Sequence, residues 1–305
     1  MKNKKQPAII KNILQHWELY LLILPGILYF AIFKYAPMYG IQIAFRDYYP
    51  GMGYLEADWV GFDNFRRFFN SYQFLSALKN TLSISLLQLV LGFPLPIILA
   101  LMLNSLRSNR LKKSLQTISY APHFISSVCM AGIILTFTSE RGIINEIIAA
   151  CGGGRVNFMG EPSLFKWVYV LGHVWKDAGW GSVMYIAALS SVDLALYEAA
   201  DVDGATRLQK IWYVDLPSIL PTIVIMLILK CGQILSIGYE EILMLQNPLN
   251  LPGSQVISTY SYQVGLLQYD YSYSTAVGMF NSVVNLVLLM SVNFISRKVN
   301  ETSLW

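Results

Sequence analysis

The stretch YEAADVDGATRLQKIWYVDLPSILP, residues 197–221, places a dense run of charged side chains between two long apolar segments. The chain as a whole has 305 residues, of which 55% are hydrophobic and 13% are charged, and its mean hydropathy is +0.47. Soluble globular domains carry about 25% charged residues. The composition therefore predicts a membrane protein, and in such a protein a loop this polar needs an explanation.

The loop has the sequence features of a helix, a turn and a second helix. Good helix formers lead into Glu198, and Gly204 allows a sharp turn that would strain a residue with a side chain. A second short helix is predicted over 205–215, and Pro217 suits the first turn of the apolar segment that follows. We therefore predict a helix-turn-helix over about 194–217, lying across one face of the membrane.

The side chains of this loop suit the binding of a partner protein. Ala199 and Ala200 allow a close approach, and the carboxylates of Glu198, Asp201 and Asp203 offer hydrogen-bond acceptors to basic groups. Such a surface favours docking of a partner over passage of a solute.

Six apolar segments are long enough to cross a bilayer, which takes about 20 residues. In lipid, every backbone amide must be paired within its own segment, so these segments are predicted to be helices. We place them near residues 19–41, 81–103, 116–138, 164–190, 217–237 and 276–296. The predicted fold is therefore all-α, a polytopic membrane protein with six transmembrane helices.

Lysine and arginine residues divide unevenly between the two sides of the membrane. If the N-terminus is cytoplasmic, the inner segments hold twelve of them: Lys2, Lys4, Lys5, Lys11, Arg107, Arg110, Lys112, Lys113, Arg207, Lys210, Arg297 and Lys298. The outer connections hold six: Arg46, Arg66, Arg67, Lys79, Arg141 and Arg155. Positive charge collects on the cytoplasmic side, so both termini are predicted to be cytoplasmic. The chain then divides into a cytoplasmic segment at 1–18, a transmembrane domain at 19–296 and a cytoplasmic tail at 297–305.

Other classes of function lack their residues in this sequence. The net charge of +4 comes with no basic stripe, which argues against a nucleic-acid partner. Cys129, Cys151 and Cys231 form no CxxC pair, so no metal site is predicted. The sequence CGGGR at 151–155 lacks the GK[ST] ending of a phosphate loop. Neither HExxH nor paired intramembrane aspartates are present, so we assign no catalytic residue and disfavour a membrane-embedded enzyme.

The spacing within the loop resembles a known motif. It reads EAA, three residues, Gly204, nine residues, Val214, one residue and then Leu216 and Pro217. This resembles the EAA loop of permease subunits in ATP-binding-cassette (ABC) importers, with Val214 in place of the family's usual isoleucine. In that family the loop forms a coupling helix that inserts into a groove of the cytoplasmic ATPase. The resemblance implies a role in ATPase coupling for Glu198, Ala199, Ala200, Asp203, Gly204, Ala205, Leu216 and Pro217.

Nearly the whole chain resembles one branch of that family, the LplB-like branch of carbohydrate permeases. The resemblance is carried by LLILPGILYFAIFKYAPMYGIQIAF (21–45), NTLSISLLQLVLGFPLPIILALMLN (80–104), YAPHFISS (120–127), WKDAGWGSVMYIAALSSVDLALYEAADVDGA (175–205), STAVGMFNSVVN (274–285) and SLW (303–305). It implies the type I ABC importer permease fold and an importer of oligosaccharides or polysaccharide fragments.

The same resemblance implies an assembly in the plasma membrane of a bacterium. The expected partners are a second homologous permease subunit, two ATPase subunits, an extracellular solute-binding protein, the oligosaccharide substrate and membrane lipid. No cofactor is expected in this chain, because ATP–Mg is bound by the ATPase subunits in that family. This chain is expected to form half of the translocation pathway.

Lys230 is the most unusual intramembrane residue. It lies roughly 20 Å along the fifth span from Pro217, where an ionisable group usually serves a cavity or a charged partner. One hypothesis is that Lys230 lines the pathway and attracts an acidic sugar such as a uronate. The alternatives are an ion pair with Asp177 or Glu240, or a side chain that extends to the outer surface.

Four more polar or aromatic residues are candidates for the substrate pathway. Asn281 and Asn285 share one face of the sixth span and either contact substrate or bind neighbouring helices. Gln233 fits the same pattern, and Trp175 suits either stacking on a sugar ring or an interfacial aromatic belt. With Lys230, these residues form the predicted pathway set.

Two alternative functions remain open. The first is a secondary transporter or channel, a class that often shows inverted repeats and interrupted helices, whereas the most distinctive feature of this sequence is its polar loop. An ABC importer for a non-carbohydrate solute would share the loop and differ in the cavity.

Overall fold

The structure, a computed structural model, describes residues 15–300 and 303–304. Across these residues the chain is helical apart from its loops and one short antiparallel pair of strands, β1 (Arg46–Asp47) and β2 (Asp58–Trp59). The predicted cations between residues 2 and 11, most of the segment 1–18, and residues 301, 302 and 305 of the predicted tail lie outside the described residues.

The apolar spans match the expected number. Five helical segments are long and apolar enough to cross a membrane: Trp17–Phe45, Tyr72–Asn104, Ser127–Ala150, Arg207–Cys231 and Tyr271–Lys298. A sixth apolar segment joins α9 (Pro162–Ser190) to α10 (Leu194–Val202) across a bend of 75°. The chain is therefore an all-α polytopic membrane protein.

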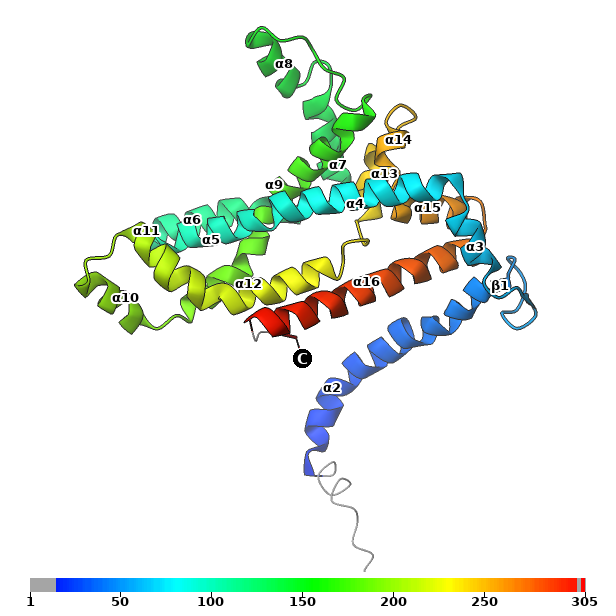
Figure 1. The fold of residues 1–305 in the computed structure, drawn as a ribbon, viewed down its shortest axis with the longest axis horizontal. Coiled ribbons are helices and arrows are strands. Elements are labelled where there is room, and N and C mark those ends of the chain that lie inside the picture. The colour runs from blue at the N-terminus through cyan, green and yellow to red at the C-terminus, as the bar shows by residue number, and fades with distance from the viewer. Residues whose placement is uncertain (1–14, 301–302, 305) are drawn as a thin grey trace, which may run out of the picture.

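The first span forms an arm that leaves the rest of the chain. The arm consists of α2 (Trp17–Phe30), a π-helical turn η1 (Ala31–Tyr35) and a 3-10 helix η2 (Ala36–Phe45). α2 has no buried residue, and Figure 1 shows it in blue, running away from the red helix α16 (Tyr271–Asn300). In contrast, η2 packs against α16. The arm is thus anchored at one end.

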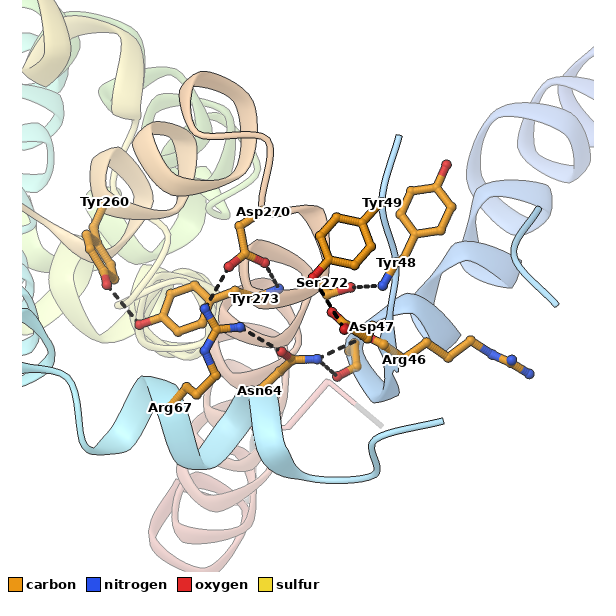
Figure 2. Close-up of polar contacts among 11 residues, drawn as sticks. Arg46, Asp47, Tyr48, Tyr49, Asn64, Arg67, Tyr260, Asp270, Ser272 and Tyr273 are labelled. Atoms are coloured by element: carbon orange, nitrogen blue, oxygen red, sulfur yellow. Dashed lines mark hydrogen bonds and ion pairs between the residues drawn. The ribbon is translucent and has the colours of Figure 1, made fainter. Parts of the chain in front are cut away.

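Polar contacts hold the anchored end of the arm, as Figure 2 shows. The side-chain amide of Asn64 on α3 (Asp63–Phe69) donates to the carbonyl oxygens of Ala44 and Arg46, each at 3.1 Å. The backbone N–H of Tyr48 donates to the hydroxyl of Ser272 at 2.9 Å, which ties the following strand to the start of α16. The arm is therefore fixed to two elements that are distant from it in sequence.

A second set of contacts joins α3 (Asp63–Phe69) to α16. Arg67 pairs with Asp270 at 2.8 Å, and its guanidinium lies 5.1 Å from the ring centre of Tyr273. The hydroxyl of Tyr273 bonds that of Tyr260 at 2.8 Å (Figure 2). These charged and aromatic groups close the end of the bundle that carries the strands.

The second span begins earlier than predicted. It consists of α4 (Tyr72–Gly92) and α5 (Pro94–Asn104), whereas the apolar pattern predicts a span near 81–103. The hydroxyl of Ser71 caps the start of α4 by accepting a backbone N–H. Pro94 has no N–H to donate, and the helix is interrupted there at Phe93.

The third span differs from its predicted bounds of 116–138. The segment divides into α6 (Asn109–Tyr120), a 3-10 turn η3 (Ala121–Phe124) and α7 (Ser127–Thr138). Pro122 removes a backbone donor within the turn, and the hydroxyl of Ser126 starts a new helix by accepting the N–H of Cys129 at 3.3 Å. The span therefore begins at Ser127, and the basic helix α6 is a separate element.

The helix α8 (Ile143–Ala150) follows α7 and ends the apolar segment Ser127–Ala150. The buried amide of Asn145 donates to the carbonyls of Ser139 and Val156, at 2.8 and 2.9 Å, and its oxygen accepts the N–H of Val156. One side chain thus closes the connection before α9 begins.

The fifth span was predicted near 217–237 and is shifted in the structure. It is continuous through α11 (Arg207–Lys210), a π-helical turn η4 (Ile211–Asp215) and α12 (Leu216–Cys231). The residues after Cys231 leave the helix. There the Ser85 hydroxyl donates to the carbonyl of Ile234, and the N–H of Leu235 donates to Asn285 Oδ1 at 3.1 Å. Short helical elements then lead to α16: α13 (Tyr239–Leu245), α14 (Leu251–Ser254), α15 (Ile257–Tyr262) and a π-helical turn η5 (Gln263–Leu267).

α9 is the central helix of the bundle. It packs against α4, α5, α6 and α12, and it contributes to two separate apolar clusters. The first includes Phe165 and Tyr169, and the second includes Tyr185 and Leu189. Between them, Gly179 lets α9 approach α6 so closely that a Cβ atom would overlap the carbonyl oxygen of Ser119.

We predict that Gly179→Ala destabilises the protein by about 1–3 kcal/mol, the usual cost of overpacking, because backbone atoms of α6 cannot move aside easily. Gly132→Ala is the matched control, since Gly132 lies in α7 and a Cβ there meets no atom within 4 Å. Thermal unfolding of the detergent-purified chain measures both changes. Equal midpoints for the two variants would contradict the close approach of α6 and α9.

Candidate functional site: the polar loop and a cavity between helices

The polar loop forms the predicted helix and turn. The carboxylate of Asp193 caps α10 by accepting the N–H of Ala195 at 3.0 Å. Gly204 has a φ of +69°, a conformation that costs a residue with a side chain about 1–2 kcal/mol. The N–H of Ala205 reaches back to the carbonyl of Ala200 at 2.9 Å, which satisfies the end of the helix. Glycine is therefore the residue that adopts this turn with the least strain.

The second half of the loop is longer than the predicted short helix. Thr206 and Gln209 form a reciprocal capping box that starts α11, and the helix continues through η4 into α12 without a break. Leu216 and Pro217 therefore lie inside a continuous helix of 25 residues and do not open a separate one. The π-helical turn η4 directly precedes this proline, which cannot donate a backbone hydrogen bond.

The coupling residues expected from the sequence are gathered at one end of the bundle. Figure 1 places α10 and α11 at the end opposite to β1 and α3. α10 has no buried residue, and Glu198, Ala199 and Asp203 are exposed on it or at its C-terminal cap. Asp201 is engaged by Lys210 within the loop. The loop thus presents an open helical face with unpaired acceptors at Glu198 and Asp203 among the described residues.

A cavity of about 420 Å³ lies between the helices. Its walls come from α4, α5, η3, α9, α12 and the segment after α12. Two residues of the predicted pathway set, Lys230 and Gln233, line it together with Gln88. Trp175, Asn281 and Asn285 are not part of its lining. The cavity has both polar and aromatic walls, as a site for a polar solute requires.

The polar wall of the cavity is a cluster of two histidines and an aspartate. Asp177 Oδ1 lies 2.9 Å from His123 Nδ1, and Asp177 Oδ2 lies 3.1 Å from His173 Nε2. The ring of His123 also stacks on Trp180, with centroids 4.8 Å apart and an angle of 3° between the planes. In the sequence these histidines look scattered, because His123 lies 54 residues from Asp177. The four-residue spacing of His173 and Asp177 on one helix was the available signal.

A second charged pair lies behind this cluster. Lys176 of α9 pairs with Glu241 of α13, which is 9% exposed, and His173 Nδ1 lies 3.8 Å from Glu241 Oε2. Neither Lys176 nor Glu241 was singled out from the sequence. A buried carboxylate needs such a cation because its desolvation is costly. The pair links α9 to α13 at the cavity wall.

Lys230 faces the cavity without an anionic partner. Within residues 15–300 and 303–304 it forms no ion pair, and the same holds for Glu240. Asp177, the other partner considered for Lys230, is held by the two histidines. Lys230 is an exposed residue in the wall of the cavity. Its assignment to the substrate pathway stays a prediction.

The two asparagines of the last span have different surroundings. Asn285 accepts the N–H of Leu235 at 3.1 Å and donates to the hydroxyl of Ser236 at 2.8 Å. It therefore holds the segment that follows α12. The Asn281 oxygen is buried and has no hydrogen-bond partner among the described residues. Trp175 is 53% exposed on α9.

A multi-spanning helical bundle with a polar cavity and an exposed helical hairpin at one end defines a membrane subunit of a transport system. Residues 92–301 match the family described as the binding-protein-dependent transport system inner membrane component. The chain belongs to this family, which confirms the resemblance based on the EAA spacing. It is an ABC importer permease subunit and not an enzyme, since ATP hydrolysis in such importers belongs to separate subunits.

Individual relatives cover nearly the full length of the chain. It is 43% identical to Protein LplB of Bacillus subtilis over 94% of this chain and 91% of that protein. It is also 43% identical to the polygalacturonan/rhamnogalacturonan transport system permease protein YteP of the same organism, over 100% of this chain and 95% of that protein. A solved bacterial alginate ABC transporter, in complex with an alginate pentasaccharide-bound periplasmic protein, contains a chain with 44% identity. That match has a TM-score of 0.87 and covers 96% of this chain and 99% of the other.

We predict that Asn285→Ala destabilises the protein by about 1–3 kcal/mol, because it leaves the N–H of Leu235 without its acceptor. Asn281→Ala is expected to cost less, since its buried oxygen has no partner to lose. Thermal unfolding of the purified chain compares the two. A larger loss for Asn281→Ala would show that the contacts of the last span are assigned the wrong way round.

Proposed function

We propose that this chain is the permease subunit of an importer for oligosaccharides or polysaccharide fragments. The observation that carries the proposal is the full-length similarity to LplB, YteP and the alginate importer chain, two of which are described as acting on polysaccharides. The cavity between the helices, with an aromatic and a polar wall, supports a sugar as the solute. An ABC importer for a non-carbohydrate solute is the alternative.

The polar loop is proposed to be the coupling element. The residues assigned to this role are Glu198, Ala199, Ala200, Asp203, Gly204, Ala205, Leu216 and Pro217. Exposure of α10, together with the unpaired acceptors at its end, supports docking into a groove of an ATPase subunit. That ATPase subunit binds ATP–Mg, and no cofactor is assigned to this chain.

The membrane orientation proposed from the charges places both termini in the cytoplasm of a bacterium. Support comes from the grouping of basic residues, because Arg107, Arg110, Arg207 and Lys210 lie in the elements α6 and α11 or just before them. Figure 1 draws these elements at the same end of the bundle as α10. The opposite end, with β1, β2 and α3, would face the extracellular solute-binding protein.

A second, homologous permease is proposed to complete the pathway. The arm supports this, because α2 has no buried residue in the chain alone and its surroundings must come from lipid and from another subunit. Binding of ATP would close two ATPase subunits and move the docked α10, which shifts the permease pair toward an outward-open state. Hydrolysis would return it to the inward-open state. This chain contributes half of the pathway and no chemistry.

The proposed pathway residues are Trp175, Lys230, Gln233, Asn281 and Asn285. Of these, Lys230 and Gln233 have the strongest support because they line the cavity. An unpaired ammonium group there suits a carboxylate-bearing sugar, such as a uronate, since the attraction is strong where water is partly excluded.

We predict that Gly204→Asp lowers sugar uptake by about tenfold or more, while the subunit still reaches the membrane. Aspartate tolerates the left-handed backbone better than most residues, so the turn persists and the added carboxylate disturbs docking. Uptake and ATP hydrolysis are measured in the assembled importer. Gly152→Asp is the control, since Gly152 also has a positive φ, +84°, but lies in another connection. Normal transport by Gly204→Asp would exclude the coupling role.

A panel of matched neutral and uronate-containing oligosaccharides tests the substrate proposal. Uptake is measured in cells that lack this subunit and in cells in which it is restored. Loss and recovery of oligosaccharide uptake are expected. If no sugar depends on the subunit, the carbohydrate assignment fails and the alternative solute gains support.

Restoring the subunit as Lys230→Gln is predicted to lower uronate uptake by about tenfold and to leave neutral sugars unchanged, because only the charge is removed. Lys166→Gln is the control: Lys166 lies on α9 outside the cavity lining. An equal loss for acidic and neutral sugars would return Lys230 to a structural role.

A further inference from the structure

We propose that Tyr197, Asp215 and Asn104 form the linkage through which α10 moves the helices that line the cavity. This inference rests on the coupling role proposed for α10 and names the contacts that would transmit its movement. The three residues come from α10, the end of η4 and the end of α5. They meet at a single carboxylate oxygen, Asp215 Oδ1.

α10 has few other connections to the membrane part of the chain. It has no buried residue, and its apolar side chains Leu194 and Val202 are 73% and 89% exposed. Its ion pair, from Asp201 to Lys210, reaches α11, the exposed first turn of the helix that continues into α12. Among the described residues, Tyr197 is the α10 side chain that forms hydrogen bonds beyond the loop. Its hydroxyl accepts from the amide of Asn104, at the end of α5, and donates to the carboxylate of Asp215, just before α12. Tyr197 therefore connects α10 to the end of α5 and to the buried carboxylate that precedes α12.

The receiving group is built to hold its position. Asp215 is 3% exposed, and a carboxylate buried to that degree must have hydrogen-bond donors. The hydroxyl of Tyr197 donates to it, and the amide of Asn104 donates to it at 3.3 Å. Asn104 Oδ1 in turn accepts from Lys112 of α6 at 3.5 Å. Hydrogen bonds to a charged group are stronger than neutral ones, so the junction resists separation.

The junction lies at the base of two cavity helices. Asn104 is the last residue of α5, and Asp215 directly precedes α12. α5 contributes Pro96 to the cavity, and α12 contributes Met226 and Lys230. If α5 and α12 move as rigid bodies, a shift of Tyr197 therefore displaces the parts of the cavity wall that both helices contribute. Asp215 and Tyr197 are positioning residues in this scheme, because neither of them lines the cavity.

The test removes one oxygen atom. Tyr197→Phe keeps the ring and abolishes the hydrogen bond to Asp215, and Tyr213→Phe is the matched control because Tyr213 lies on η4 and is 80% exposed. Each variant is placed in the assembled importer and purified through a tag on this chain. The amounts of subunit and of bound ATPase, ATP hydrolysis and uptake into vesicles are all measured.

For Tyr197→Phe we expect normal assembly and about tenfold less solute imported per ATP hydrolysed, the scale of one lost hydrogen bond to a charged group. Tyr213→Phe is expected to leave this ratio unchanged. Asp215→Asn supplies a second variant of the same shape. It keeps an acceptor oxygen for Tyr197 and should lower the ratio less than Tyr197→Phe does.

Three results would overturn the linkage. The first is an unchanged amount of solute imported per ATP hydrolysed in Tyr197→Phe, while Gly204→Asp uncouples transport. This result would support the coupling role of α10 and exclude Tyr197 as the residue that transmits its movement. The second is an equal fall in hydrolysis and uptake. The third is a loss of bound ATPase, which would place Tyr197 in docking itself. If Gly204→Asp and Tyr197→Phe both transport normally, the coupling role of α10 fails as well.

Discussion

Pairing of backbone hydrogen-bond groups is the constraint on which this structure depends. Hydrocarbon contains no water to bond an unpaired N–H or C=O, so a chain that crosses lipid forms helices, and backbone groups freed at a helix break need hydrogen-bond partners within the protein. Here side chains supply those partners. The Ser85 hydroxyl and Asn285 serve the segment after α12, and the Ser126 hydroxyl starts α7 anew. The cavity lies beside the break after α12, since Gln233, Ile234 and Ser236 of that segment line it.

Charge in the cavity wall is handled by mutual pairing. Asp177 is shared by His123 and His173, and Glu241 is held by Lys176, so the wall presents polar atoms at modest electrostatic cost. Lys230 stands apart from this arrangement within the described residues. In the proposed pathway, where the solute must be attracted weakly enough to be released, this separate cation would give one adjustable contact.

Much of the fold was accessible from the sequence, because long apolar runs and the EAA spacing are local patterns. The number of spans, the turn at Gly204 and the exposed helical loop all follow from them. The bounds of the second, third and fifth spans did not. In the third, hydropathy averages across Pro122 and Ser126, whereas the helix is broken by single donors and acceptors. The contacts of Asp177 with His123 and of Asp215 with Asn104 were also out of reach. Both partners lie on other helical elements, and nothing in a single sequence records which elements become neighbours.

The anchor of the N-terminal arm shows how such a subunit can change without losing its fold. Asn64 binds the carbonyl oxygens of Ala44 and Arg46, and Ser272 accepts the N–H of Tyr48. In each of these three bonds, the atom contributed by the arm or by the residues of β1 and its end is a main-chain atom. Substitutions along α2 therefore leave the anchor in place. The arm can diverge to fit a new neighbour in the membrane, such as a different paired subunit or a different lipid composition, while the bundle behind it stays the same.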